Sequence, residues 1–109
     1  MYVLWIMENI FVYGTLVNSM QRYLILQHNV EAEDDMLKDY SVAMHTYLMV
    51  YPTIKKDKGK SVNGKVFKAE PLDIERMDKY ETFNYEKIKV KLASGKEALA
   101  YIEVSYENA

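Results

Sequence analysis

A short apolar segment that runs directly into Tyr13-Gly14-Thr15-Leu16 is the feature that most limits how this chain can fold. Residues 9–12 include three consecutive apolar side chains, Ile10 to Val12, and have the length of a buried strand. Glycine has no Cβ, so the backbone can turn sharply at Gly14 and approach a ligand closely. Apolar side chains at helical spacing over residues 16–27 predict a helix that begins at this turn. Backbone amides at such a point suit a carboxylate or a developing oxyanion.

The middle of the chain predicts more strands. Residues 31–35 are acidic and indicate a surface segment, and residues 40–51 alternate with two rather apolar faces, as in a barrel or a covered sheet. Residues 57–60 have the composition of a turn. Residues 61–67 predict a strand, and Gly64 inside it indicates a bulge or a close approach of another backbone.

The C-terminal third predicts one helix and a hairpin. Pro71 suits the first turn of a helix that runs to Lys79 with Ile74 and Met77 facing inward. Residues 87–92 alternate lysine with an apolar side chain, residues 93–95 form a turn, and the chain returns to residue 104, which predicts an antiparallel hairpin. The pattern predicts one α+β domain with a mixed sheet and two short helices.

Charge and composition exclude several classes of function. The chain has 109 residues, no cysteine and a net charge of −2. Without cysteine it lacks disulfides, thiolate nucleophiles and zinc–thiolate sites. With a negative net charge it lacks the excess of basic residues that non-specific binding of nucleic acid needs. The basic run Lys55, Lys56, Lys58 and Lys60 is interpreted as a solvated turn. No apolar run approaches the ~20 residues of a membrane span, so we expect no membrane partner. The absence of cysteine is compatible with a reducing cytoplasm, which is the location we expect.

Two interpretations of the N-terminus remain open. Residues 1–7 are apolar but lack the basic start of a signal peptide. Met7 could be the working start, which would make residues 1–6 an extension to the domain. Alternatively, residues 1–6 add a strand segment in which Trp5 packs.

Five landmarks between residues 9 and 102 occur in the order typical of one protein family. The landmarks are Tyr13-Gly14-Thr15-Leu16, Tyr51-Pro52, Val62-Asn63-Gly64-Lys65-Val66-Phe67, Met77-Asp78-Lys79-Tyr80-Glu81 followed by Tyr85, and Ala100-Tyr101. The chain thus resembles the γ-glutamylcyclotransferase-like family, which includes plant proteins first named for induction by avirulence. The resemblance implies the α+β fold of that family, a small mixed barrel-like β-sheet with two short helices.

The resemblance also implies a reaction and its residues. Relatives cyclise a γ-glutamyl amine or γ-glutamyl amino acid: the α-amine of the substrate attacks its own γ-carbonyl and releases 5-oxoproline. Such a small-molecule reaction needs a general acid/base but no cofactor, and Glu81 corresponds to that group. Tyr13, Gly14, Thr15 and Leu16 correspond to the γ-glutamyl cradle, and Tyr85 and Tyr101 to tyrosines near the pocket. His28 and His45 lack metal-ligand spacing, so no metal site is expected.

Each of these residues also has a purely structural interpretation. Glu81 could be a surface glutamate at a helix C-terminus, although the helix dipole disfavours a negative charge there. The tyrosines could belong to the core, and Asp78 is expected to be solvated or to make a structural hydrogen bond. Thr82 stands where the family usually has glycine, and Met77 stands where it usually has leucine. Thr82 supports an alternative function, a catalytically inert small-molecule-binding module that uses the same pocket.

Overall fold

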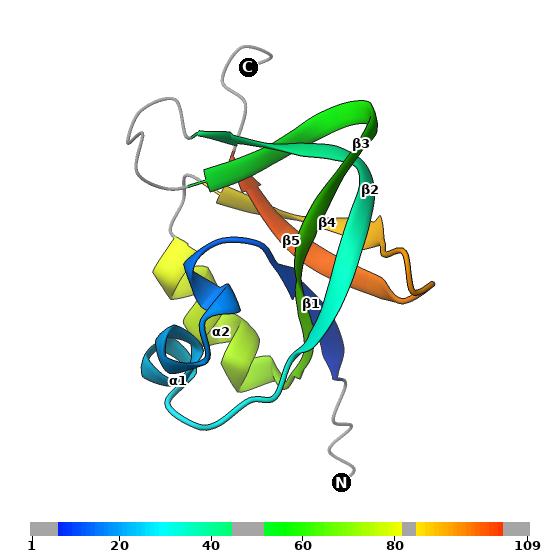
Figure 1. Ribbon diagram of the computed structural model, residues 1–109. Coiled ribbons are helices and arrows are strands. Elements are labelled where there is room, and N and C mark those ends of the chain that lie inside the picture. Colours follow the sequence, from blue (N-terminus) through cyan, green and yellow to red (C-terminus); the bar gives the residue numbers. More distant parts are fainter. Residues whose placement is uncertain (1–6, 45–51, 82–84, 104–109) are drawn as a thin grey trace, which may run out of the picture.

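The strands of the computed structural model, which describes residues 7–44, 52–81 and 85–103, form one curled sheet (Figure 1). In chain order they are β1 (Glu8–Val12), β2 (Glu33–Met44), β3 (Pro52–Ala69), β4 (Tyr85–Lys91) and β5 (Glu97–Glu103). Their order in the sheet is β2-β3-β1-β5-β4. β1 runs parallel to β5, and the other neighbouring pairs are antiparallel. The predicted mixed, barrel-like sheet is confirmed as a curled half-barrel.

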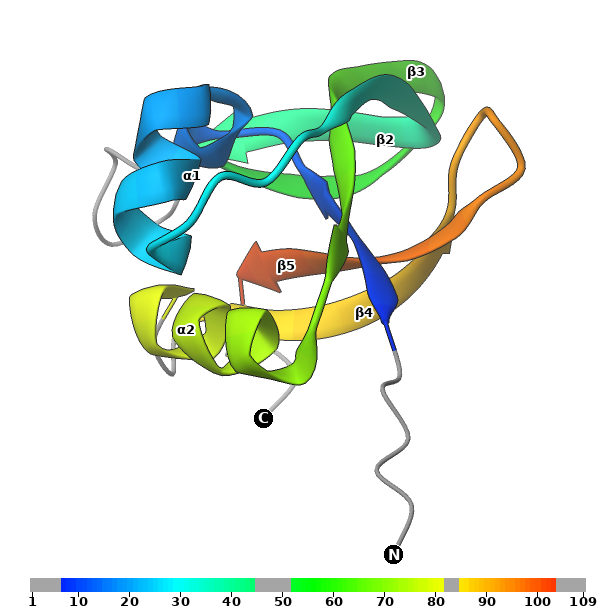
Figure 2. The same cartoon turned by 90° about the horizontal axis from the view of Figure 1, so that it is seen from below.

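Two α-helices lie side by side against one side of this sheet, α1 (Ser19–Leu26) and α2 (Pro71–Glu81) (Figure 2). The prediction of one helix over residues 16–27 is wrong at its start. A short 3-10 turn, η1 (Thr15–Val17), comes first, and Asn18 has extended backbone angles between η1 and α1. The Asn18 side chain accepts hydrogen bonds from the amides of Met20 and Gln21 at 2.9 and 3.1 Å. This side-chain cap begins a new helix, because it satisfies amides that have no intrahelical acceptor.

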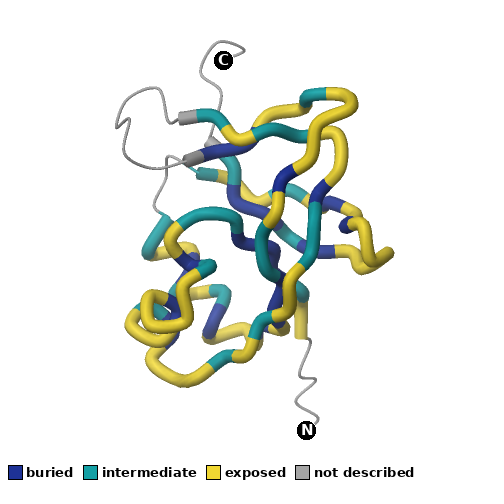
Figure 3. The backbone as a smooth tube through the Cα atoms, in the orientation of Figure 1, coloured by how far each residue is buried: buried dark blue, intermediate teal, exposed yellow. Residues whose placement is uncertain are grey.

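The side of α1 that faces the protein interior does not carry all of its apolar residues. Met20, Tyr23 and Leu24 are exposed by 69%, 49% and 60%, whereas Arg22 and Leu26 are buried. Figure 3 shows this helix mostly in the colour of exposed residues. Apolar spacing predicted a helix where α1 lies, but it could not show which side of the helix meets the sheet.

Alternation along β1 separates two groups of core residues. Ile10 and Val12 pack in a cluster with Leu26 of α1 and Met77 of α2. Phe11 points the other way, into a cluster of strand residues where the curled sheet packs against itself. A strand that is buried on both faces explains the continuous apolar run of residues 10–12. β1 therefore lies between the two halves of the core, and the chain leaves it at Tyr13.

The predictions for the second helix and the hairpin are confirmed. α2 begins at Pro71, and Met77 is fully buried. β4 and β5 pair antiparallel around a turn in which Gly95 has a φ of +95°. Gly64 shows the close approach that the sequence indicated, since a Cβ at this position would lie 2.2 Å from the main-chain oxygen of Val12.

Two expectations for the middle of the chain need correction. β2 already begins at Glu33, so the acidic segment 31–35 is partly strand. Residues 57–60 do not reverse the chain but lie within β3, where the pairing moves from Lys38 opposite Ser61 to Tyr40 opposite Lys56. The extra residues form a large bulge around Asp39, whose carboxylate accepts from the Gly59 amide at 3.0 Å. Of the predicted strand over residues 40–51, residues 40–44 lie in β2, and residues 45–51 lie outside the described residues.

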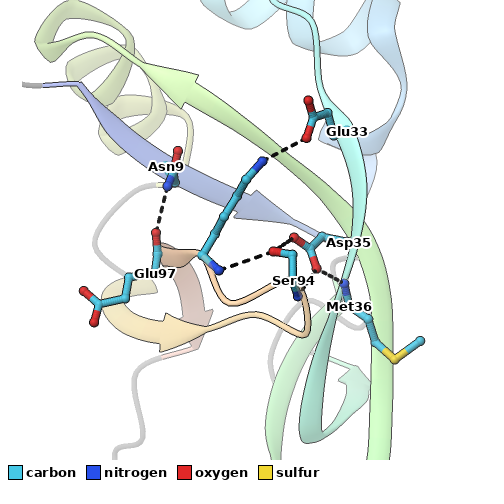
Figure 4. Close-up of polar contacts among 7 residues, drawn as sticks. Asn9, Glu33, Asp35, Met36, Ser94 and Glu97 are labelled. Atoms are coloured by element: carbon cyan, nitrogen blue, oxygen red, sulfur yellow. Dashed lines mark hydrogen bonds and ion pairs between the residues drawn. The ribbon is translucent and has the colours of Figure 1, made fainter.

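The turn between β4 and β5 is tied to β2, and this contact draws together the two edges of the half-barrel (Figure 4). The amide of Ala93 donates to the carbonyl of Met36 at 2.7 Å. The Ser94 hydroxyl donates to Asp35 at 2.6 Å, and the Lys96 ammonium lies 2.8 Å from a carboxylate oxygen of Glu33. Burial would raise the pKa of Asp35, but the hydrogen bonds from Ser94 and from the Met36 amide outweigh it and lower the pKa.

Candidate active site

A cavity of about 50 Å³ opens where the segment after β1 passes the C-terminal end of α2. That volume accommodates a few water-sized groups, each of which needs ~10–15 Å³. Its walls come from β1, the following turn, α2 and strands β4 and β5. They are formed by Phe11, Val12, Tyr13, Gly14, Thr15, Leu16, Tyr80, Glu81, Tyr85 and Tyr101.

Glu81 is the last residue of α2 and supplies the carboxylate of this cavity. Its side chain is partly buried, and this burial raises the pKa of the carboxyl from its ordinary 4.5 to about 7. The cause is desolvation, because an apolar wall disfavours the charged form. A carboxyl group with a pKa near neutrality exchanges a proton readily in both directions, as a general acid/base must.

Two of the cavity tyrosines have hydroxyl groups that donate within the protein. The Tyr13 hydroxyl donates to the main-chain carbonyl of Tyr101, and the Tyr101 hydroxyl donates to Asp78 at 2.6 Å. Burial raises the pKa of Tyr13, partly offset by a hydrogen bond with Thr53, and burial also raises the pKa of Tyr101. Both phenols therefore stay protonated at neutral pH and shape the cavity rather than exchange protons.

Tyr80 joins α2 to the turn after β1, and the sequence assigned it no role. Its hydroxyl lies 2.7 Å from the hydroxyl of Thr15, and the two share a hydrogen bond. The available signal for such a role was its position in the sequence, immediately before Glu81. The Tyr80–Thr15 contact fixes the turn against the end of the helix that carries Glu81.

Arg22 is a second residue that the sequence reasoning missed. It is 5% exposed, and its guanidinium donates to the carbonyls of Leu16, Val17 and Val30 at 3.1, 2.8 and 3.3 Å. An arginine can serve several acceptors at once because its donors form a rigid fork. Its signal in the sequence was a lone charge within an apolar helical pattern. Arg22 holds η1 in place and thereby supports the turn that lines the cavity.

The described lining offers hydroxyls, a carboxylate and main-chain groups, and it includes no lysine, arginine or histidine. Such a lining suits a small molecule that carries an amine and amide groups. Within the described ranges no three His, Asp or Glu side chains are grouped as metal ligands would be. His28 instead lies 2.6 Å from buried Asp73, and His45 falls outside the described ranges. No helix in the described part of the chain is long and apolar enough to cross a membrane.

Comparison with known families identifies the group to which the chain is related. The sequence model of the family described as "Gamma-glutamyl cyclotransferase, AIG2-like" matches residues 10–108. The chain belongs to this γ-glutamyl cyclotransferase, AIG2-like family. A search of curated protein sequences finds no match.

Solved structures show the same fold. A protein of Arabidopsis thaliana, determined in solution, has a TM-score of 0.77 and 22% identity over 94% of this chain and 72% of its own. A γ-glutamyl cyclotransferase has a TM-score of 0.76 and 20% identity over 93% of this chain and 69% of its own. A Homo sapiens protein has a TM-score of 0.75 and 21% identity, covering 92% of this chain and 68% of its own. These likenesses support the family fold.

The structure places all the sequence-predicted site residues around this one cavity. The four residues Tyr13 to Leu16 form one wall, and Glu81, Tyr85 and Tyr101 form others. Tyr85 and Tyr101 come from the paired strands β4 and β5. Thr82, on which the binding-module interpretation rests, lies outside the described residues.

Proposed function

We propose that this protein is a γ-glutamyl cyclotransferase in which Glu81 acts as the general acid/base. The observation that carries the proposal is the position of Glu81, a partly buried carboxyl with a pKa of about 7 that lines the same small cavity as residues Tyr13 to Leu16. Membership of the γ-glutamyl cyclotransferase, AIG2-like family supports the same reaction class.

The reaction proposed for this cavity is an intramolecular acyl transfer. The α-amine nitrogen of the substrate forms a bond to its own γ-carbonyl carbon and closes the five-membered ring of 5-oxoproline. The bond from that carbon to the leaving nitrogen breaks, and an amine or an amino acid is released. The nitrogen of the protonated α-amine loses two protons as it becomes the ring N–H. Glu81 takes one and returns it to the leaving nitrogen, and solvent accepts the other and supplies the second proton of the released ammonium, so the protein ends the cycle unchanged.

The pKa of Glu81 suits these two proton transfers. An α-amino group has a pKa of about 8 and is mostly protonated at neutral pH, so it needs a base before it can attack. Transfer of this proton to a base with a pKa of about 7 is unfavourable by only roughly tenfold in the equilibrium constant. The protonated carboxyl is then acidic enough to give the proton to the leaving nitrogen. An exposed glutamate, with a pKa near ~4.3, would be a weaker base by several hundredfold.

The Tyr13–Leu16 turn is proposed to hold the γ-glutamyl group. The residues of that wall carry main-chain amides and the Thr15 hydroxyl, and amide donors can stabilise the negative oxygen that develops on the γ-carbonyl. Tyr85 and Tyr101 would limit how the γ-glutamyl arm folds. Holding the amine against the carbonyl contributes to the rate by orientation.

A panel of γ-glutamyl amines and γ-glutamyl amino acids tests the proposal. We expect the wild type to release 5-oxoproline, detected by mass spectrometry, from at least one class of substrate. Glu81→Gln should turn over at least ~100-fold more slowly, the usual contribution of a positioned general base. Glu75→Gln is the matched control, because Glu75 lies on the same helix and its side chain is 62% exposed.

The binding-module alternative makes a different prediction. It expects no turnover from the wild type or from Glu81→Gln, together with measurable binding of a γ-glutamyl compound or of 5-oxoproline by calorimetry. Equal cyclisation rates for the wild type and Glu81→Gln would instead leave the enzyme proposal standing and refute the role of Glu81.

A further inference from the structure

A chain of two hydrogen bonds links the helix that carries Glu81 to Tyr13, which begins the turn that also lines the cavity. Asp78, one helical turn before Glu81, accepts from the Tyr101 hydroxyl at 2.6 Å. The main-chain carbonyl of Tyr101 in turn accepts from the hydroxyl of Tyr13. α2, β5 and the segment after β1 are distant in sequence, and these bonds join all three at the cavity.

We propose that Asp78 is a positioning residue that holds Tyr101, and through it Tyr13, in place relative to Glu81. This inference rests on the proposed cyclotransferase function, since Tyr13 and Tyr101 matter as walls of the substrate cavity. Asp78 itself is absent from the cavity lining. It therefore acts through Tyr101 and is not a catalytic residue.

The burial of Tyr101 explains why its partner matters. Tyr101 is 5% exposed, so its hydroxyl has little access to water. A buried donor that loses its acceptor destabilises the folded state by its full desolvation cost. To avoid this cost, the Tyr101 ring must move or water must enter the site. Residues three apart lie on neighbouring positions of a helix surface, so Asp78 and Glu81 present their side chains toward the same side.

Lys87 holds the other oxygen of the same carboxylate. Its ammonium on β4 lies 3.1 Å from Asp78 Oδ2, while Oδ1 receives the Tyr101 hydroxyl. The Asp78 side chain is 47% exposed and that of Lys87 is 34% exposed. An ion pair this exposed contributes little stability, but it restricts the carboxylate to the orientation that Tyr101 needs.

Three variants test the proposal by steady-state kinetics. We expect Asp78→Ala to lower kcat by about tenfold with a smaller change in KM, because one charge-assisted hydrogen bond is lost and the γ-carbonyl is misplaced relative to Glu81. Asp78→Asn retains an acceptor oxygen and should recover most of the activity. Glu75→Ala removes an exposed carboxylate from the same helix and should match the wild type. Unchanged kcat in Asp78→Ala would overturn the proposal.

A double-mutant cycle with Tyr101→Phe separates this link from a general structural effect. If Asp78 acts through the Tyr101 hydroxyl, the double variant should be no slower than either single variant, about tenfold below wild type. Additive losses, about 100-fold in the double variant, would show that Asp78 acts independently and would overturn the proposal. Asp78→Leu, which keeps the size but removes both acceptors, replaces Asp78→Ala if that variant does not fold.

Ring signals of ¹³C-labelled tyrosine provide a test that does not depend on turnover. The signals of Tyr13 and Tyr101 are assigned from the Tyr13→Phe and Tyr101→Phe spectra. We expect both to shift in Asp78→Ala and to stay in place in Glu75→Ala. If the wild type cyclises nothing, the proposed function fails, and these spectra still decide the link. Unchanged ring signals in Asp78→Ala would overturn it whatever the activity.

Discussion

Glu81→Gln should make the protein more stable above neutral pH while it removes the proposed catalytic base. Glutamine has nearly the same shape as glutamate but carries no charge. Folding of the variant therefore does not include the desolvation cost of a carboxylate. A residue that is retained for packing would show the opposite result, a loss of stability on substitution. The combination of lost activity and gained stability is the signature of a group that the fold disfavours but the chemistry needs.

The size of this effect follows from the pKa of Glu81. Each tenfold change in proton affinity corresponds to about 1.4 kcal/mol, so a pKa of about 7 in the folded state against 4.5 in the unfolded state corresponds to about 3 kcal/mol. Solvent reaches part of the side chain and reduces this figure to roughly 1–3 kcal/mol. Because the folded-state pKa is the higher one, the folded protein binds the proton more tightly. The free energy of unfolding of the wild type should therefore fall as pH rises from 4.5 to about 7. Above that pH the loss should have reached its full size and should not grow further.

Urea unfolding of wild type and Glu81→Gln at several pH values measures this difference. Below pH 4.5 the two proteins should have nearly equal free energies of unfolding, because the wild-type carboxyl is protonated in both states. At pH 8 the variant should have the larger free energy of unfolding. In a thermal melt at this pH, each kcal/mol of added stability should raise the Tm by roughly 4–8 °C. Glu75→Gln should show no comparable change, since its exposed side chain has no desolvation to relieve. A Glu81→Gln protein that is less stable than wild type at pH 8 would refute the reasoning.

Further expectations concern turnover and particular side chains. Wild-type kcat/KM should decrease on acidification through about pH 7 as Glu81 gains its proton, and a profile that stays flat down to pH 5 would contradict its role as base. Gly14→Val adds a branched side chain to the cavity wall and should weaken 5-oxoproline binding, measured by calorimetry, by at least ~10-fold. Gly64→Ala should destabilise the domain by at least ~2 kcal/mol, since its Cβ would lie 2.2 Å from a backbone oxygen; an unchanged unfolding midpoint would contradict this. Ser94→Ala should cost about 1 kcal/mol through the lost 2.6 Å bond to Asp35, with Ser61→Ala, an exposed strand serine, as the control.

Local pattern was sufficient for much of the secondary structure. Alternating residues in β4 and β5, Pro71 at the start of α2, and Gly95 in the hairpin turn all reflect interactions between near neighbours in the chain. The order of short landmarks was sufficient to identify the family. It also selected residues that the structure places around one cavity. Gly64 was informative because glycine inside a strand indicates a bulge or the close approach of another backbone, and the structure shows the close approach.

The features that the sequence did not show depend on contacts between distant segments. Apolar spacing predicted α1 but not its orientation, because exposed Met20 and buried Arg22 owe their places to the sheet and to carbonyls outside the helix. The lysine-rich segment 57–60 has the composition of a turn, yet pairing with β2 on both sides of it, at Lys56 and at Ser61, keeps it within β3 as a bulge.

The sequence by itself determined which residues could do the chemistry, and only the tertiary structure decided what state they are in. Glu81 could be identified as a candidate from its place in a landmark. Its pKa depends on how much water reaches the carboxylate, which is set by walls contributed by β1, β4 and β5. The bond from Tyr101 to Asp78 spans 23 positions, and no local pattern encodes such a pair. Desolvation and hydrogen bonding act through space, so they appear only when the folded chain brings these segments together.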